Sequence, residues 1–285
     1  DRAMHPLPTR SGLALPLALA LGACGGGDDE PELTCIEKAT CALEIVSGDG
    51  QSGVVAEPLG APLVVRVTDE AGAPASVTVT WTPGEGGGGL ASMTTSTDDA
   101  GEASVEGSFG RQAGAQTFEA QIEGLDGPSV TFSVTARPAA GEQIEAVAGG
   151  GQTGTAGEAL PSPLEVAVTD RFGNRVPGVA ITWRVVAGMG DIVPGPMDQA
   201  ETDETGVSSA RPTLGPLAGE ENNVFTATPQ SFRADPVVFI ASARAGAPAA
   251  LTKVTPDQQL GGQPGETLAV PLAVRVLDAN MNPVQ

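Results

Sequence analysis

Residues 62–69 read PLVVRVTD, and this stretch returns as PLEVAVTD at residues 163–170 and as PLAVRVLD at residues 271–278. In every copy a Leu and two Val residues fill alternate positions, and the residues between them are mixed in polarity. Side chains of a β-strand point alternately to its two faces, so this alternation is typical of a strand with one face against a core. The stretch therefore predicts three equivalent, half-buried strands.

Further segments recur around this strand in the same order. GQSG at 50–53 matches GQTG at 151–154, VTVTW at 77–81 matches VAITW at 179–183, and TDDAG at 97–101 matches TDETG at 202–206. Turn-forming residues separate these segments, and no stretch outside the N-terminal region keeps a helical period. Short strands that repeat every ~100 residues predict an all-β chain of tandem Ig-like antiparallel β-sandwiches, arranged as beads on a string.

The second copy resembles a known family in detail. Its DRFGNRVPGV at 170–179, together with the Gly-Gln-x-Gly, Ile-Thr-Trp and Thr-Asp-x-x-Gly segments, is similar to the group 1 bacterial immunoglobulin-like domain of intimin- and invasin-type adhesins. The first copy departs from that pattern at Gly72-Ala-Pro74. The resemblance implies a stalk or adhesive array. The copies contain no Cys, so we expect core packing around Trp81 and Trp183 to hold each sandwich without an inter-sheet disulfide.

The domain organisation follows from these copies and from the N-terminal composition. We expect five parts: a lipoprotein signal peptide at 1–23, a lipidated Cys with a flexible acidic tether and small Cys loop at 24–42, Ig-like repeat 1 at 43–137, Ig-like repeat 2 at 144–245, and a truncated Ig-like repeat 3 at 251–285.

The N-terminal region carries an export signal. The apolar run LALPLALAL at 13–21 is too short to span a bilayer but suits a signal-peptide core. LGAC at 21–24 resembles the lipobox of bacterial lipoproteins, which implies cleavage before Cys24 and its acylation. By the same resemblance, Gly25 after the Cys favours the outer membrane. The alternative is an ordinary signal peptide with an incidental Cys.

Cys35 and Cys41 remain after lipidation. An exported chain enters an oxidising compartment, so we expect these two to form one local disulfide. A metal site there would lack ligands, because no His lies nearby.

Composition restricts the remaining functions. The net charge of −21 disfavours nucleic-acid binding. The one His, His5, lies in the predicted signal, so the rest of the chain lacks the commonest general base at neutral pH. We therefore expect no enzyme activity and no cofactor.

Acidic residues gather in two matching turns, and they have two interpretations. Asp98, Asp99, Asp203 and Glu204 are either solvated turn residues or weak calcium ligands. The spacing does not match the twelve-residue loop of an EF-hand, which favours the turn.

Together these features predict a membrane-anchored envelope or surface lipoprotein whose repeats form a stalk or adhesin-type spacer. We expect a monomer, with a protein or glycan on another surface as its receptor. The alternatives are a non-catalytic spacer of a larger surface enzyme or lectin, whose functional domain would lie beyond residue 285, and a calcium-stiffened structural module.

Lipidation at Cys24 is directly testable. Mass spectrometry of the membrane-extracted protein should find an acylated Cys24 at the mature N-terminus, because LGAC resembles a lipobox. Several acyl chains on one residue would also hold the protein stably in the membrane. A Cys24→Ser variant should leave the membrane fraction. A mature N-terminus at another residue would contradict the prediction.

Overall fold

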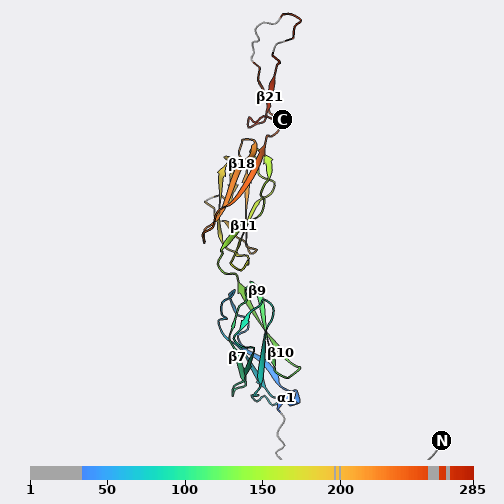
Figure 1. Cartoon of the computed structure of the whole chain (residues 1–285), viewed down its shortest axis with the longest axis vertical. Coiled ribbons are helices and arrows are strands. Elements are labelled where there is room, and N and C mark those ends of the chain that lie inside the picture. Colours follow the sequence, from blue (N-terminus) through green and yellow to red (C-terminus); the bar gives the residue numbers. More distant parts are fainter. Residues whose placement is uncertain (1–33, 196, 199, 256–262, 268–269) are drawn as a thin grey trace, which may run out of the picture.

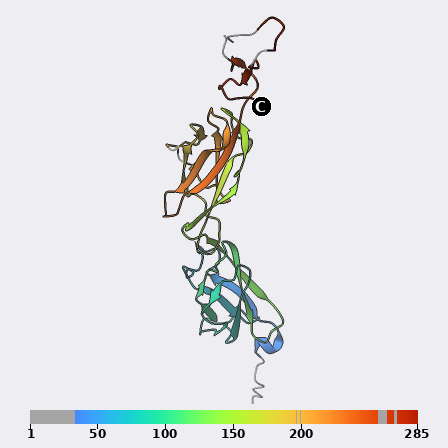
Figure 2. The same cartoon turned by 45° about the horizontal axis from the view of Figure 1, so that its top comes forward.

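The structure is a computed structural model that describes residues 34–195, 197–198, 200–255, 263–267 and 270–285. Two β-sandwiches follow each other along the long axis of the molecule, with the short helix α1 (Cys35–Lys38) at one end and β21 (Val274–Leu277) toward the other (Figures 1 and 2). The predicted all-β architecture of tandem Ig-like sandwiches is confirmed.

Repeat 1 packs a three-stranded sheet, in the order β1-β3-β7, against a five-stranded sheet in the order β2-β10-β9-β4-β6. A small third sheet pairs β5 with β8. The strands are β1 (Ala42–Ser47), β2 (Ser52–Val54), β3 (Leu63–Thr68), β4 (Thr78–Pro83), β5 (Gly89–Leu90), β6 (Thr94–Ser96), β7 (Glu102–Val105), β8 (Gly107–Ser108), β9 (Gly114–Ile122) and β10 (Ser129–Arg137).

Repeat 2 has the same plan, with sheets in the orders β11-β13-β17-β15 and β12-β19-β18-β14-β16. Its strands are β11 (Gln143–Ala148), β12 (Thr153–Thr155), β13 (Leu164–Thr169), β14 (Ala180–Ala187), β15 (Asp191–Val193), β16 (Ala200–Glu201), β17 (Val207–Thr213), β18 (Gly219–Pro229) and β19 (Val237–Arg244). After it, β20 (Ala250–Lys253) pairs antiparallel with β21, as β11 pairs with β13.

The quoted strand behaves as its alternation predicts. In β3, Leu63, Val65 and Val67 are buried while the residues between them are partly exposed. In β13 the three equivalent residues are buried as well. The third copy differs, since Leu272 and Val274 are 76% and 64% exposed, and β21 has only β20 as a partner in the described part of the chain.

Each sandwich is built around one Trp. Trp81 and Trp183 are both 0% exposed, and each ring lies beside a Phe of the same sheet, with centroid distances of 6.0 Å to Phe132 and 5.8 Å to Phe239. The indole N–H groups also have partners: Trp81 donates to Thr95 Oγ1 and Trp183 to Ser208 Oγ. A buried Trp with a satisfied N–H contributes its full apolar area to the core.

One feature, which occurs in both repeats, differs from the expected uniform antiparallel pairing. The short strands β2 and β12 pair in parallel with the last strand of their own repeat, β10 and β19. Both short strands contain a Gly where a Cβ would collide with a neighbouring side chain: Phe109 at Gly53 and Leu214 at Gly154. The recurring Gly-Gln-x-Gly segment therefore marks this close approach, which the alternation of apolar residues does not reveal.

Segment 144–245 should fold when it is produced alone, because it holds a complete two-sheet core. Its Trp183 fluorescence should be blue-shifted in water and lost in one cooperative denaturant transition. The variant Trp183→Ala should cost ~3–5 kcal/mol, as for other buried Trp residues. Exposed Trp fluorescence in the unmodified segment would contradict this prediction.

Candidate functional site at the junctions between repeats

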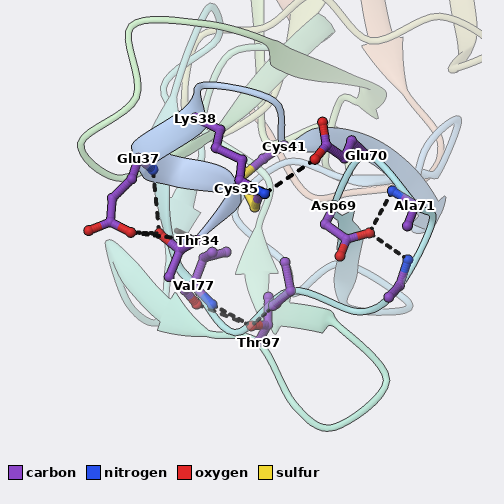
Figure 3. Close-up of a disulfide and its surroundings, with 12 residues drawn as sticks. Thr34, Cys35, Glu37, Lys38, Cys41, Asp69, Glu70, Ala71, Val77 and Thr97 are labelled. Atoms are coloured by element: carbon purple, nitrogen blue, oxygen red, sulfur yellow. Dashed lines mark hydrogen bonds and ion pairs between the residues drawn. A yellow bond between two sulfur atoms is a disulfide. The ribbon is translucent and has the colours of Figure 1, made fainter. Parts of the chain in front are cut away.

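The two remaining cysteines lie at the outer end of repeat 1. Cys35 and Cys41 form a disulfide with a Cα–Cα distance of 5.0 Å, and both are buried in the core of that repeat. The residues between them form α1, which begins with a capping box between Thr34 and Glu37 (Figure 3). The expected local disulfide thus encloses one turn of helix. A run of four helical residues is too short to show a helical period in the sequence.

Helix α1 lies against the loop that follows β3. Lys38 Nζ is 3.3 Å from Glu70 Oε1, and a cleft of about 300 Å³ is lined by both α1 and the loop (Figure 3). Asp69 Oδ1 closes that loop by accepting from the backbone N–H groups of Ala71 and Ala73. The helix and its disulfide therefore cover the end of repeat 1 that faces away from repeat 2 (Figure 1).

In the two acidic turns, the Asp98 and Asp203 carboxylates accept hydrogen bonds from backbone N–H groups of the same turn. Asp98 Oδ1 accepts from the N–H groups of Ala100 and Glu102, and Asp203 Oδ1 accepts from Thr205 and Val207. The Thr205 hydroxyl and these N–H groups hold the pKa of Asp203 below its ordinary value.

The neighbouring Asp99 and Glu204 are exposed. Within the described ranges, no group of three or more His, Cys, Asp or Glu residues is placed to hold a metal ion. The same residues include no helix long and apolar enough to cross a membrane. Cys24 lies outside the described residues.

The main contact that the sequence did not reveal lies between the two sandwiches. The loop after β13, residues 170–174, has the same turn as its counterpart in repeat 1: Asp170 Oδ1 accepts from the N–H groups of Phe172 and Asn174. The second oxygen, Asp170 Oδ2, accepts from the backbone N–H of Ala139 in the connecting segment, at 2.9 Å. One buried carboxylate thus ties the loop to the chain that arrives from repeat 1.

Asn174 bridges to the body of repeat 1. Its Oδ1 accepts from Ala113 N at 2.9 Å, and its Nδ2 donates to Arg111 O at 2.8 Å and to Asp170 Oδ2 at 2.9 Å. The side-chain amide therefore uses both of its functional groups across the junction, and Asp170 orients it.

An aromatic contact accompanies these hydrogen bonds. Phe172 packs against the core of repeat 1, and the guanidinium groups of Arg111 and Arg171 lie 5.7 Å and 4.7 Å from its ring centroid. A cation over an aromatic face within ~6 Å is attractive.

The second junction repeats this geometry. Asn282 Oδ1 accepts from Ala218 N, its Nδ2 donates to Pro216 O and Asp278 Oδ2, and Asp278 Oδ2 accepts from Gly246 N, all at 2.8–2.9 Å. Asn280 stands where the first junction has Phe172, and its Nδ2 donates to Ala156 O. Two junctions with different neighbouring residues thus share the same set of Asp and Asn contacts.

The loops that Asn174 and Asn282 contact, residues 110–113 and 215–218, are held by buried side-chain amides of their own repeats. Gln116, which is fully buried, accepts from Gly110 N and donates to Gln112 O, so it fixes the loop that presents Arg111 and Ala113. In repeat 2 the buried Asn223 accepts from Gly215 N beside Pro216. Buried amides that are satisfied in this way rigidify the backbone they contact.

These contacts change the acidity of the two carboxyls. Burial acts to raise the pKa of Asp170, but hydrogen bonds from the Asn174 side chain and from the backbone outweigh it, so the pKa lies below 3.8. The pKa of Asp278 is lowered chiefly by the Asn282 side chain, with backbone N–H groups adding to the effect and desolvation opposing it. Both carboxyls are therefore ionised at neutral pH.

The sequence did carry one signal for this site. Asp-x-x-x-Asn occurs at 170–174 and 278–282, whereas the first copy has Asp69 followed by Ala73. The sequence shows that the first copy has Ala73 in place of this Asn, but sequence patterns predict only a turn for the loop. The partners of Asn174 are backbone groups of Arg111 and Ala113, and backbone groups leave no pattern in a sequence.

Comparison with known proteins supports the fold of the repeats. No protein-family model matches the sequence, and no curated protein matches it. The structure of FdeC, an Escherichia coli adhesin, aligns with 86% of this chain and 75% of its own, at a TM-score of 0.52 and 16% identity. The repeats share the immunoglobulin-like fold of this adhesin. InvD of Yersinia pseudotuberculosis aligns with 86% of this chain and 72% of its own, at 0.52 and 15%. The expected resemblance is thereby confirmed for the fold of these Ig-like repeats.

The lowered pKa of Asp170 gives a pH prediction. A lowered folded-state pKa contributes stability above the unfolded value of ~3.9, and that contribution is lost as the pH falls through the folded value. Asp170→Asn should destabilise repeat 2 by ~1.5–3 kcal/mol at neutral pH, the usual loss for hydrogen bonds to a charged group, and by less well below pH ~3.8.

Thermal unfolding followed by Trp183 fluorescence, in a Trp81→Phe background, measures this difference at both pH values. Asp69→Asn, which alters the equivalent turn at the end of repeat 1 that α1 covers, is the matched control and should leave the Trp183 transition in place. An Asp170→Asn deficit of equal size at both pH values would contradict the prediction.

Proposed function

We propose that this protein is an envelope lipoprotein, anchored in the outer membrane through Cys24, whose Ig-like repeats form a non-catalytic, adhesin-type spacer at the cell surface. The observation that carries the proposal is the end-to-end arrangement of the two sandwiches (Figures 1 and 2). The same hydrogen-bonded contacts recur at both junctions. Such an arrangement extends reach along one direction.

The domain plan of the proposal follows the sequence copies: repeats at 43–137 and 144–245 and a third, partial repeat at 251–285, after a lipidated tether at 24–42. The fold it shares with FdeC, which is an adhesin, is consistent with a place at the surface. The proposed receptor is a protein or glycan on another surface, and the proposed state of the chain is a monomer.

The spacer differs physically from a catalytic architecture. An active site between two domains requires them to enclose a cleft, whereas the first junction is filled by the Asn174 amide, the Phe172 ring and the connecting segment. The acidic surface also favours separation of neighbouring copies, because like charges repel within the ~8 Å screening length of physiological salt.

Small-angle scattering tests the geometry of the spacer. Residues 43–245 should give an elongated particle, because eleven-residue strands such as β18 extend ~36 Å at ~3.3 Å per residue and the two sandwiches follow each other. A radius of gyration near ~16–17 Å, the value for a compact globule of this length, would overturn the spacer.

Antibody access on intact cells tests the location. An epitope tag after Gln285 should be reached on cells that produce the full chain, and deletion of residues 144–245 should reduce access because the tag then lies closer to the membrane. Access only after permeabilisation would contradict a surface role. Equal access in both chains would contradict the spacer.

A further inference from the structure

The loops after β3, β13 and β21 form the same Asx turn, but the residues at their tips differ. In repeat 1 Asp69 accepts from Ala71 N at 2.9 Å and from Ala73 N at 2.8 Å. In repeat 2 Asp170 accepts from the equivalent N–H groups at 2.8 and 2.9 Å. The turn therefore closes equally well with Ala or with Asn at its last position.

The turn does not require Asn, so the Asn side chain is free to form hydrogen bonds outside the turn. In both loops that carry it, Asn174 and Asn282, its oxygen accepts from one backbone N–H of the preceding repeat and its nitrogen donates to a carbonyl two residues earlier in that repeat. The pairs are Ala113 with Arg111, and Ala218 with Pro216. An amide that faces one donor and one acceptor is complementary to this particular loop end.

The end of repeat 1 that would carry such a contact is closed. Ala71 and Ala73 stand where Phe172 and Asn174 stand in repeat 2, and α1 covers the loop through the Lys38–Glu70 ion pair. The buried disulfide Cys35–Cys41 joins α1 to the core of repeat 1 at that end (Figure 3). Phe172 of repeat 2 packs against the same core at the other end.

We propose that the Asp-x-x-x-Asn loop is the surface by which a repeat of this chain recognises the loop end of the repeat before it, and that repeat 1 is closed to such a partner by Ala71, Ala73 and the disulfide-linked helix. The fitting partner is an Ig-like repeat whose braced loop offers a carbonyl and, two residues later, an N–H. Residues 34–41 are then the terminal cap of the array. This inference concerns contacts between repeats and does not depend on the surface location proposed above.

Distance measurements between spin labels test the recognition. Labels on Thr131→Cys in β10 and Ser209→Cys in β17, both exposed, report the separation of the two repeats in a chain of residues 34–285, where Cys35 and Cys41 are bonded to each other. The unmodified junction should give one narrow distance peak. Asn174→Ala should lose that peak and give a broad distribution, because it removes the hydrogen bonds to Ala113 and Arg111. Ala is also the residue that repeat 1 carries at the equivalent position, Ala73.

Asn174→Asp keeps the shape but removes the donors and places a second carboxylate beside Asp170, so it should broaden the distribution at least as much. Thr205→Ala, which removes a hydroxyl that donates to Asp203 within an Asx turn of repeat 2, is the matched control and should keep the narrow peak. Trp183 fluorescence, measured in the same Trp81→Phe background, verifies that repeat 2 stays folded in each chain. A narrow peak in both folded Asn174 variants would overturn the recognition.

The closed end has its own test. In a chain of residues 34–245 the groups of Pro216 and Ala218 that bond Asn282 are free to receive a partner. Ala73→Asn in this chain places the amide at the closed end but leaves α1 in place, so the chain should remain a monomer by light scattering and keep the narrow distance peak. End-to-end dimers of this variant would overturn the closure by α1. An epitope tag that is not accessible on intact cells, in contrast, would count against the surface role proposed above and not against these contacts.

Discussion

The buried carboxylate of Asp170 holds two segments of the chain together: one oxygen closes its own turn, and the other accepts from Ala139 of the connecting segment and from the Asn174 side chain of the turn. Asn174 then reaches Arg111 and Ala113 in the preceding repeat. The orientation of repeat 2 relative to repeat 1 thus depends on the Asp170 carboxylate, whose negative charge is stabilised by hydrogen bonds from N–H groups. Burying that charge would be costly if any of these donors were missing.

The balance of charges explains why amides are used here. The chain has 35 acidic and 14 basic residues, so an arrangement that relied on an ion pair at every junction would have few cations to use. Charge–amide hydrogen bonds in a buried site are also less sensitive to salt than exposed ion pairs are. The junction is therefore suited to an environment whose ionic strength varies.

Much of the fold could be predicted from residues alone. The alternation in 63–68 and its copies identified the strands, and Val79 and Trp81 identified a second core strand, because period two and burial are local properties of the sequence. The parallel pairing of β2 with β10 and the α1 helix were missed. Both depend on contacts or lengths that produce no periodic pattern, and the junctions were missed because their partners are backbone atoms.

The equivalence of the two junctions has a consequence for the gene. Arg111 and Ala113 present to Asn174 the same groups that Pro216 and Ala218 present to Asn282. If unequal recombination between the copies removed or duplicated one unit, the new neighbours would meet through contacts that already exist. The length of the array could then change in whole-repeat steps during evolution, without any new interface having to arise first.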